Sequence, residues 1–307
     1  MQVRFVLGPA GSGKTYRCLA EIRDALRAAP EGLPLVVLAP KQATFQLERQ
    51  LLADPALPGY TRLQILSFER LAKLILEESA LVQPKLLDEE GRVMVLRARL
   101  AQAQPQLRIF RAAVRWPGFA RQLSLLLREL QRYQHSPEKL FSLAAKTAAP
   151  PQLGDKLHDL ALLLRAYLDW LKQHQLQDAD GLLDLATAAL RESSRTTPRP
   201  APLRLAGLWL DGFAEMTPQE LDFLAGVILS CERATLAFCL EGQSTEDLSW
   251  LSTWSAVRQT FHNCYQRLRS LPNCEVLCDV LERRDGQGRF ANNPILQHLE
   301  KHWAAPK

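Results

Sequence analysis

Short apolar runs alternate with amphipathic stretches over the first eighty residues of the chain. The runs at residues 3–7, 35–39 and 63–66 are bounded by polar or glycine-containing loops, which is typical of buried strands. Behind each run, apolar residues recur at helical spacing, and the first of these helices is predicted to begin near Gly13. This alternation predicts an α/β fold with a parallel sheet and ligand loops at the carboxyl ends of its strands.

Helical periodicity without a convincing strand follows from about residue 81. The clearest amphipathic stripe is formed by Leu157, Leu160, Ala161, Leu164, Leu168 and Leu171. Asp180 is predicted to cap the next helix, and residues 193–202 form a polar, proline-rich linker. We therefore expect residues 81–202 to form an all-helical insertion.

The strand pattern resumes at residues 205–211, an apolar run that ends in Asp211. Thr217 and Glu220 form a capping box with Pro218 at the first helical position. Further elements are predicted as a strand at 234–240, a helix at 254–271, a strand at 275–281 and a short helix at 294–303. The expected division is a core of residues 1–80 and 203–240, the insertion, and residues 241–307 as the end of the core and the start of a following region.

Composition narrows the class of protein. The chain has 307 residues, which favours two structural units or one domain with a large insertion. The hydrophobic fraction of 47% is ordinary, and no uncharged apolar run approaches the ~20 residues of a membrane span. Because the chain also starts directly with a strand, we expect a cytoplasmic protein that does not associate with membranes.

The cysteines and the charges differ in what they indicate. The six cysteines include no C-x-x-C pair, which favours buried thiols over a metal cluster or disulfides. The net charge of +5 is concentrated in residues 85–132, which hold ten Lys and Arg against four acidic residues. This basic region is either a nucleic-acid surface or an ordinary solvated face.

A glycine-rich loop between the first strand and the first helix carries the strongest chemical signal. It fits the pattern G-x-x-x-x-G-K-[ST] with Gly8, Pro9, Ala10, Gly11, Ser12, Gly13, Lys14 and Thr15. Such a loop turns backbone N–H groups toward a phosphate, while its Lys reaches the β- and γ-phosphates and its Thr binds Mg²⁺. The order of strand, loop and helix favours a nucleoside triphosphate site over an accidental glycine-rich turn. Asp211 is predicted to be the second Mg²⁺ residue rather than a plain strand-end carboxylate.

Four segments resemble successive motifs of a superfamily 1 helicase-like domain. They are residues 8–15, 39–45, 66–72 and 210–220, and their nearest match is the N-terminal region of the B subunit of AddAB/RexAB-type helicase-nucleases. Residues 289–294 resemble the same family, so the resemblance spans the chain. It implies a RecA-like P-loop core that binds ATP and Mg²⁺, DNA as a single strand or duplex end, and an A subunit as heterodimer partner in double-strand break repair and recombination. Members are far longer, with a second motor domain and a nuclease, so we expect an N-terminal fragment or a truncated relative.

One position departs from the helicase pattern. Active motors of this superfamily have Asp-Glu at the end of the second strand motif, and the Glu orients the attacking water; here Gly212 follows Asp211. The sequence therefore predicts ATP binding with little hydrolysis. The resemblance also places DNA contacts at Lys41, Gln42, Thr44, Ser67 and Phe68.

Two alternatives stay open at this point. Phe45 and Phe68 are better explained as core residues of their helices than as rings that stack on bases. The chain could also be a small P-loop enzyme such as a kinase, with its acceptor site in the helical insertion. Such a site needs convergent acidic or His residues near the loop, and the sequence points to none.

Overall fold

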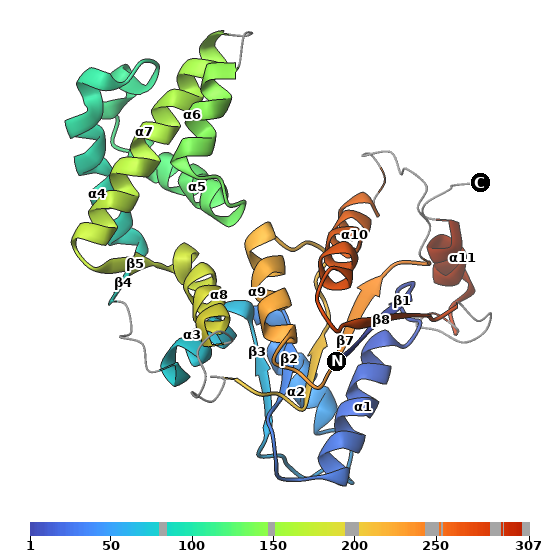
Figure 1. Ribbon diagram of the computed structural model, residues 1–307. Coiled ribbons are helices and arrows are strands. Elements are labelled where there is room, and N and C mark those ends of the chain that lie inside the picture. Colours follow the sequence, from blue (N-terminus) through green and yellow to red (C-terminus); the bar gives the residue numbers. More distant parts are fainter. Residues whose placement is uncertain are drawn as a thin grey trace. The chain divides into compact units, whose positions relative to one another are not determined.

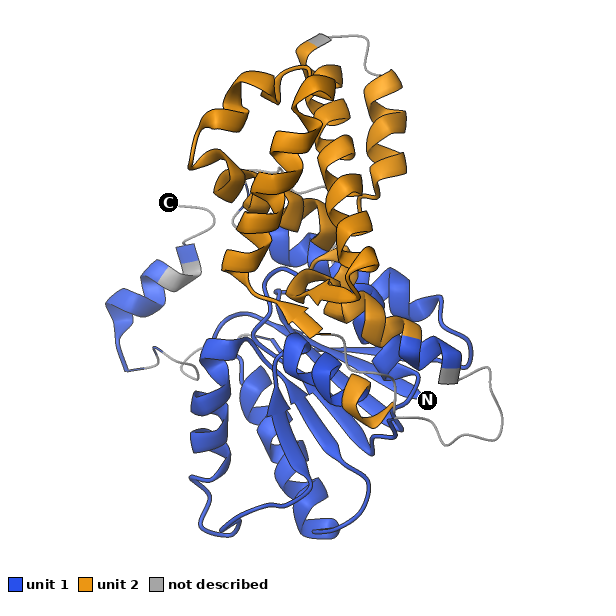
Figure 2. Cartoon of the chain, turned by 90° about the vertical axis from the view of Figure 1, so that its left-hand side faces the viewer, with its two compact units in different colours: residues 1–75, 189–216, 221–307 blue, residues 76–188, 217–220 orange. Residues whose placement is uncertain are grey.

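The computed structural model describes residues 1–79, 85–146, 151–193, 203–242, 252, 254–282, 290 and 292–302. The chain forms two compact units (Figure 2). Unit 1 comprises residues 1–75, 189–216 and 221–307, and unit 2 comprises residues 76–188 and 217–220. The predicted linker at 193–202 lies outside the described residues, apart from Ser193.

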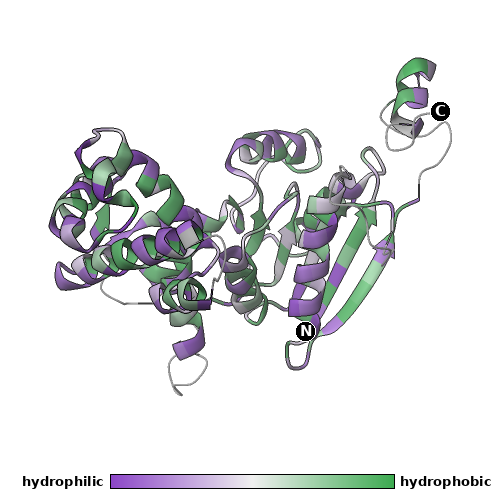
Figure 3. Cartoon of the chain, turned by 90° about the horizontal axis from the view of Figure 1, so that it is seen from above, coloured by the Kyte–Doolittle hydropathy of each residue, from purple (hydrophilic) through white to green (hydrophobic). Residues whose placement is uncertain are grey.

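A six-stranded parallel sheet is the centre of unit 1 (Figure 1). Its strands lie in the order β3-β2-β6-β7-β1-β8, and each neighbouring pair is parallel. The strands are β1 (Gln2–Gly8), β2 (Leu35–Leu38), β3 (Leu63–Leu66), β6 (Gly207–Leu210), β7 (Arg233–Cys239) and β8 (Glu275–Val280). They carry mainly hydrophobic residues, whereas the helices alternate between polar and apolar positions (Figure 3). The predicted α/β fold is confirmed.

Helices cover both faces of this sheet. The helices of unit 1 include α1 (Lys14–Ala28), α2 (Thr44–Leu51), α3 (Phe68–Glu78), α9 (Pro218–Ile228), α10 (Ser255–Arg269) and α11 (Pro294–His302), with a 3₁₀ turn, η1 (Lys41–Ala43), before α2. In β1, Arg4 binds Glu21 of α1 and Phe5 packs on Phe261 of α10. Because neighbouring residues of a strand point to opposite faces, α1 and α10 lie on opposite sides of the sheet.

One carboxylate ties α1 to three strands. Glu21 accepts hydrogen bonds from Arg4 of β1 at 2.5 Å, from the indole N–H of Trp209 in β6 at 3.1 Å and from the hydroxyl of Thr235 in β7 at 3.2 Å. Trp209 is 1% exposed, so its indole N–H depends on this partner. The network fixes the helix that follows the glycine-rich loop.

Two predicted helix starts are confirmed by their hydrogen bonds. The backbone N–H of Thr217 donates to the carboxylate of Glu220 at 2.8 Å, and the N–H of Glu220 donates back to the Thr217 hydroxyl at 3.3 Å. Ser67 precedes α3, and its hydroxyl accepts from the N–H of Arg70 at 3.4 Å. The sequence located both helix starts because capping needs particular side chains at fixed spacing.

Unit 2 is mainly helical. Its elements include α4 (Glu89–Ala103), η2 (Gln104–Gln106), η3 (Phe110–Arg115), α5 (Phe119–Arg132), α6 (Pro137–Lys146), α7 (Pro151–Gln173), η4 (Ala179–Gly181) and most of α8 (Leu182–Ser193). The predicted stripe on α7 is buried in the core of this unit at Leu160, Ala161, Leu164 and Leu171.

Two expectations for this region were wrong in detail. Strands β4 (Lys85–Leu87) and β5 (Leu176–Asp178) pair in parallel, so the insertion is not entirely helical. With three residues each, they are too short to show an alternating pattern in the sequence.

Asp180 does not cap a helix. Asp178 has that role, because its carboxylate accepts the N–H of Gly181 at 3.0 Å. Asp180 is buried, and its carboxylate binds Arg92, Arg128 and Arg132. In the sequence, Asp178 and Asp180 both fit the pattern of an acidic residue that caps the following helix. Only the fold brings three arginines to Asp180.

No helix among the described residues is long and apolar enough to cross a membrane.

All six cysteines are free thiols. Burial raises the pKa of Cys18 and of Cys231 to about 12, so these thiols stay protonated.

Candidate nucleotide site at the carboxyl end of the sheet

The loop after β1 depends on glycine at three positions. Gly11 and Gly13 have φ of 81° and 92°, in the left-handed region that other residues rarely adopt. A Cβ at Gly8 would collide with the hydroxyl of Ser12, whose oxygen is buried and has no hydrogen-bond partner among the described residues. A buried hydroxyl without a partner is costly, so this loop suits a ligand that offers an acceptor.

Lys14 lies across the inside of this loop. Its Nζ donates to the carbonyl oxygens of Gly8 at 2.8 Å and Pro9 at 2.7 Å. Burial lowers the pKa of Lys14, and the nearby Asp211 carboxylate opposes that shift. The ammonium is thus held at the loop by two neutral acceptors, which the oxygens of an anion could replace.

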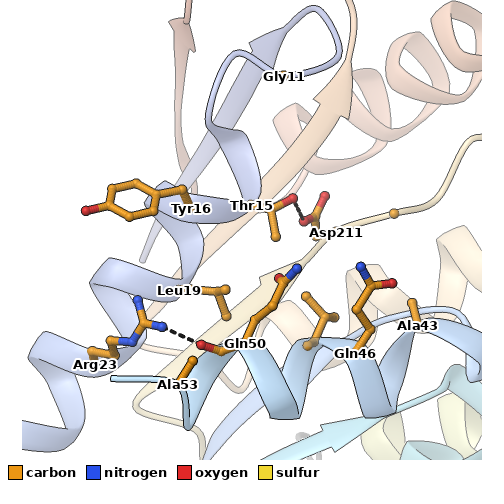
Figure 4. Close-up of a pocket in the computed structure, with 12 residues that line it drawn as sticks. Gly11, Thr15, Tyr16, Leu19, Arg23, Ala43, Gln46, Gln50, Ala53 and Asp211 are labelled. Carbon is orange, nitrogen blue, oxygen red and sulfur yellow. Dashed lines mark hydrogen bonds between the residues drawn. The ribbon is translucent and has the colours of Figure 1, made fainter. Parts of the chain in front are cut away.

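Thr15 and Asp211 meet although they are 196 positions apart in the sequence. The Thr15 hydroxyl donates to a carboxylate oxygen of Asp211 at 2.5 Å (Figure 4). Thr15 lies in the first turn of α1, and Asp211 follows β6 directly, so both lie at the carboxyl ends of parallel strands. A hydroxyl and a carboxylate are the oxygen ligands that Mg²⁺ takes beside a phosphate, so this pair fits the predicted ion.

A pocket of about 740 Å³ opens beside this pair. Thr15 and Tyr16 of α1, Gln46 and Gln50 of α2, and Asp211 are among the residues that line it (Figure 4). Tyr16 is 73% exposed, so the pocket adjoins an accessible aromatic ring. The two helices and the strand end therefore leave space next to the candidate metal ligands.

The residue after Asp211 is restricted to glycine by its backbone. Gly212 has φ of 86°, and a Cβ there would lie 3.2 Å from Cδ of Pro40. Glu220, a carboxylate further along the chain, is engaged in the capping box with Thr217. The position at which active motors have a water-orienting Glu thus has neither a carboxylate nor a backbone suited to one.

The loop after β2 presents polar groups that are partly engaged. Lys41 is exposed, and its Nζ binds the Glu69 carboxylate at 2.5 Å. Glu69 also binds Lys73 at 3.2 Å, and the hydrogen bond from Lys41 helps to lower the pKa of Glu69. The Thr44 hydroxyl donates to the Lys41 carbonyl at 3.0 Å, while Gln42 is exposed. A phosphate at Lys41 would have to compete with Glu69.

The two aromatic candidates have opposite environments. Phe68 is 4% exposed and packs on Phe213 and Phe223. Its assignment to the core is confirmed, and in this environment its ring does not reach a base. Phe45 is 74% exposed, so its assignment to the core was wrong. Helix α2 buries Leu47 and Leu51 instead, and that i, i+4 pair was the signal that excluded Phe45 from the core.

Ser67 is also withdrawn from the surface. It is 6% exposed, and its hydroxyl is used at the start of α3. Of the five residues that the resemblance assigned to DNA, the loop residues Lys41 and Gln42 are exposed, Thr44 is half-buried, and Ser67 and Phe68 are buried.

The fold and this site define a class of protein. A parallel sheet, a glycine-rich loop between β1 and α1, and a strand-end carboxylate bound to the loop threonine define a parallel α/β domain, here with a helical insertion. The family model described as "ADDB, N-terminal" matches residues 5–300. The chain therefore belongs to the ADDB N-terminal family, and the predicted resemblance is confirmed.

Curated relatives agree with this assignment. Proteins named as the B subunit of an ATP-dependent helicase/deoxyribonuclease match from Symbiobacterium thermophilum with 41% identity over 98% of this chain and from Desulforudis audaxviator with 38% over 99%. A protein of the same name from Pelotomaculum thermopropionicum is 36% identical over 99% of the chain. The matches cover 25–26% of these relatives, so the chain spans about a quarter of their length.

Proposed function

We propose that this chain is the nucleotide-binding, helicase-like N-terminal part of a helicase-nuclease B subunit. In this role it acts with an A subunit on DNA during double-strand break repair and recombination. The names of the relatives support the complex, and the proposal for this chain concerns binding and guiding rather than cleavage. A kinase-like enzyme has no comparable support, because the family match spans the helical insertion as well as the core.

The observation that carries the proposal is the contact between Thr15 and Asp211. ATP would be held by the backbone N–H groups of the loop and by Lys14, with Thr15 and Asp211 as ligands of Mg²⁺. Bound Mg²⁺ would neutralise charge on the β- and γ-phosphates. The unpartnered Ser12 hydroxyl supports the same site, because a phosphate oxygen would satisfy it.

Hydrolysis is expected to be very slow. Turnover needs a positioned water as well as bound phosphates. Gly212 supplies no side chain for that water, whereas Lys14, Thr15 and Asp211 keep the groups that bind the ground state. The proposed function is therefore that of a nucleotide-dependent scaffold.

DNA contacts are proposed for the loop after β2. Lys41 is the phosphate partner, Gln42 and Thr44 bind phosphate or sugar, and the exposed ring of Phe45, rather than the buried ring of Phe68, stacks on a base. Because few charges take part and Lys41 is paired with Glu69, binding should be weak and sensitive to salt.

Calorimetry with ATP and Mg²⁺ tests the nucleotide site. Lys14→Ala should weaken ATP binding by roughly 1.5–3 kcal/mol, because it removes a charge-assisted hydrogen bond. Lys73→Ala is the matched control, since it removes a half-buried lysine that binds Glu69. Equal affinity of wild type and Lys14→Ala, or no binding by the wild type in Mg²⁺, would overturn the proposal.

A further inference from the structure

A basic segment with an exposed tryptophan follows α4 in unit 2 and ends in the first turn of α5 (Figure 1). We call residues 108–121 the Trp116 segment; it contains no acidic residue and carries Arg108, Arg111, Arg115 and Arg121. Trp116 is 66% exposed, and Ile109 is 41% exposed. An indole is the largest apolar side chain, and here it faces solvent within a stretch of sequence whose charged residues are all basic.

Two of the four arginines are engaged and two are not. Arg108 binds Asp155 at 2.8 Å, and Arg111 donates to the carbonyl of Pro105 at 3.0 Å. Arg115 and Arg121, on either side of Trp116 in the sequence, are exposed and have no ion pair or side-chain hydrogen bond within the part of the chain that the structure describes. Their guanidinium groups are available to an anionic partner.

The start of the Trp116 segment is anchored by a buried carboxylate. Asp159 is 0% exposed, and its oxygens accept the backbone N–H groups of Arg108, Ile109 and Phe110 at 2.9–3.0 Å. Exposed tips of unanchored loops move freely, but this backbone is held by three charge-assisted bonds. The segment therefore begins from a fixed position.

The backbone at Trp116 is also held from both sides. The N–H of Trp116 donates to Ala113 at 3.0 Å, and its carbonyl accepts from Phe119 at 3.1 Å. Within the same segment, the rings of Phe110 and Phe119 pack with centroids 5.1 Å apart. An aromatic ring on a preorganised backbone loses little conformational freedom when it binds a flat partner. Helix α5 then begins without a side-chain cap or an acidic residue in its first turn, which adds partial positive charge nearby.

We propose that the Trp116 segment binds single-stranded DNA, with the indole stacked on a base and with Arg115 and Arg121 on neighbouring phosphates. Stacking needs a base whose face is free, so a single strand fits this surface and a closed duplex does not. The inference rests on the proposed role in DNA guiding and extends it to unit 2. Such contacts tolerate any sequence, because every base has a face that can stack.

Fluorescence polarisation with the whole 307-residue chain separates base stacking from charge. Trp116→Ala should weaken binding of a short single-stranded oligonucleotide by on the order of 10- to 100-fold, while Trp116→Phe keeps most of the affinity. Trp116→Ala should leave binding of an abasic oligonucleotide of equal length unchanged. Arg115→Gln combined with Arg121→Gln should weaken both ligands and reduce the slope of log K on log salt by roughly 0.7 per lost phosphate contact.

Matched controls guard against loss of structure. Tyr133→Ala removes another exposed aromatic ring of unit 2, and Arg165→Gln removes an exposed arginine that is paired with Glu138. Both variants should bind the oligonucleotide like the wild type. Circular dichroism of Trp116→Ala should match the wild type, since the indole is mostly exposed.

Three outcomes overturn the inference. The first is that Trp116→Ala binds the oligonucleotide as tightly as the wild type, and the second is an equal loss for the abasic strand. The third is that the variant fails to capture a co-expressed A subunit while its DNA affinity is unchanged, which would make this surface a protein interface. Nucleotide calorimetry on Trp116→Ala should match the wild type, so failure at this surface is distinguishable from failure of the nucleotide site.

Discussion

Replacing Gly212 by Glu restores the carboxylate that active motors use to orient water. We expect the variant to lose stability and gain no activity. The φ of 86° costs a residue with a Cβ on the order of 1–2 kcal/mol. The contact at 3.2 Å with Pro40 adds to that strain, because a ring fused to the backbone cannot easily move aside. Together, the backbone strain and the contact with Pro40 should lower the free energy of unfolding by roughly 1–3 kcal/mol.

The expected absence of activity has a separate cause. A correctly placed Glu would orient water, but it adds no cation to stabilise the charge that develops on the γ-phosphate. Each 1.4 kcal/mol of barrier that stays in place costs about tenfold in rate. Strain at residue 212 would also shift Asp211, which is the preceding residue and the proposed Mg²⁺ ligand. The substitution therefore disturbs ground-state binding before it helps the reaction.

The assay pairs denaturant unfolding with steady-state ATP hydrolysis. Gly212→Ala isolates the backbone strain, since it adds a Cβ without a carboxylate. Gly59→Glu adds the same carboxylate where a Cβ meets nothing within 4 Å, so it should unfold like the wild type. A rise in turnover of tenfold or more in Gly212→Glu, abolished by Lys14→Ala, would refute this account of Gly212. Turnover of the wild type near ~1 s⁻¹, the ordinary enzyme range, would refute it equally if that turnover depends on Lys14.

Three further predictions follow from charges in unit 1. Glu69→Gln should release Lys41 and tighten single-stranded DNA binding at low salt. The slope of log K against log salt should become steeper by roughly 0.7 for each phosphate that Lys41 then neutralises. Unchanged DNA affinity would show that Lys41 is not a DNA contact. Glu21→Ala should lower the free energy of unfolding by roughly 2–4 kcal/mol, because three buried or half-buried donors lose their acceptor. The control Asp24→Ala, on the exposed side of the same helix, should change it by less than about 0.5 kcal/mol, and equal losses would contradict the network. Burial lowers the pKa of Lys14, so its ammonium loses its proton at a lower pH than an ordinary lysine does. Calorimetry at rising pH should therefore show ATP affinity falling as the pH passes through this lowered pKa. An ATP affinity that stays constant up to the usual pKa range of lysine would disprove the role of the ammonium.

The elements predicted correctly from sequence are those whose signal is local. Buried strands of a parallel sheet have continuous apolar runs, so β1, β2 and β7 could be read directly. The capping box at Thr217 and Glu220 was equally local, because its partners are three positions apart. Strands β4 and β5 could not be found, since three residues carry no period.

Features that depend on tertiary contacts were predicted less well. Lys41 was expected to be free for phosphate, but α3 brings Glu69 to it from 28 positions away. The exposure of Phe45 depended on which face of α2 meets the sheet, and that face is set by Leu47 and Leu51. The meeting of Thr15 and Asp211 is the exception. It was predictable because parallel strands place their carboxyl ends at one edge, whatever the length of the insertion between them.

On the proposed function, Asp211 and Gly212 are adjacent in sequence but relate to different stages of a phosphoryl transfer. A carboxylate on Mg²⁺ contributes already in the bound ground state, whereas a water-orienting Glu contributes only as the transition state forms. Under this proposal, the chain keeps the carboxylate that binds Mg²⁺ and has a glycine with positive φ in place of the water-orienting Glu. Nucleotide binding then acts as a structural ligand for unit 1, because the loop, α1 and Asp211 all belong to that unit. Its free energy adds to folding by mass action, by about 2.7 kcal/mol when free ATP is 100 times its Kd. A P-loop without turnover can thus stabilise the loops at the carboxyl edge of the sheet, and the proposed DNA contacts lie on one of them.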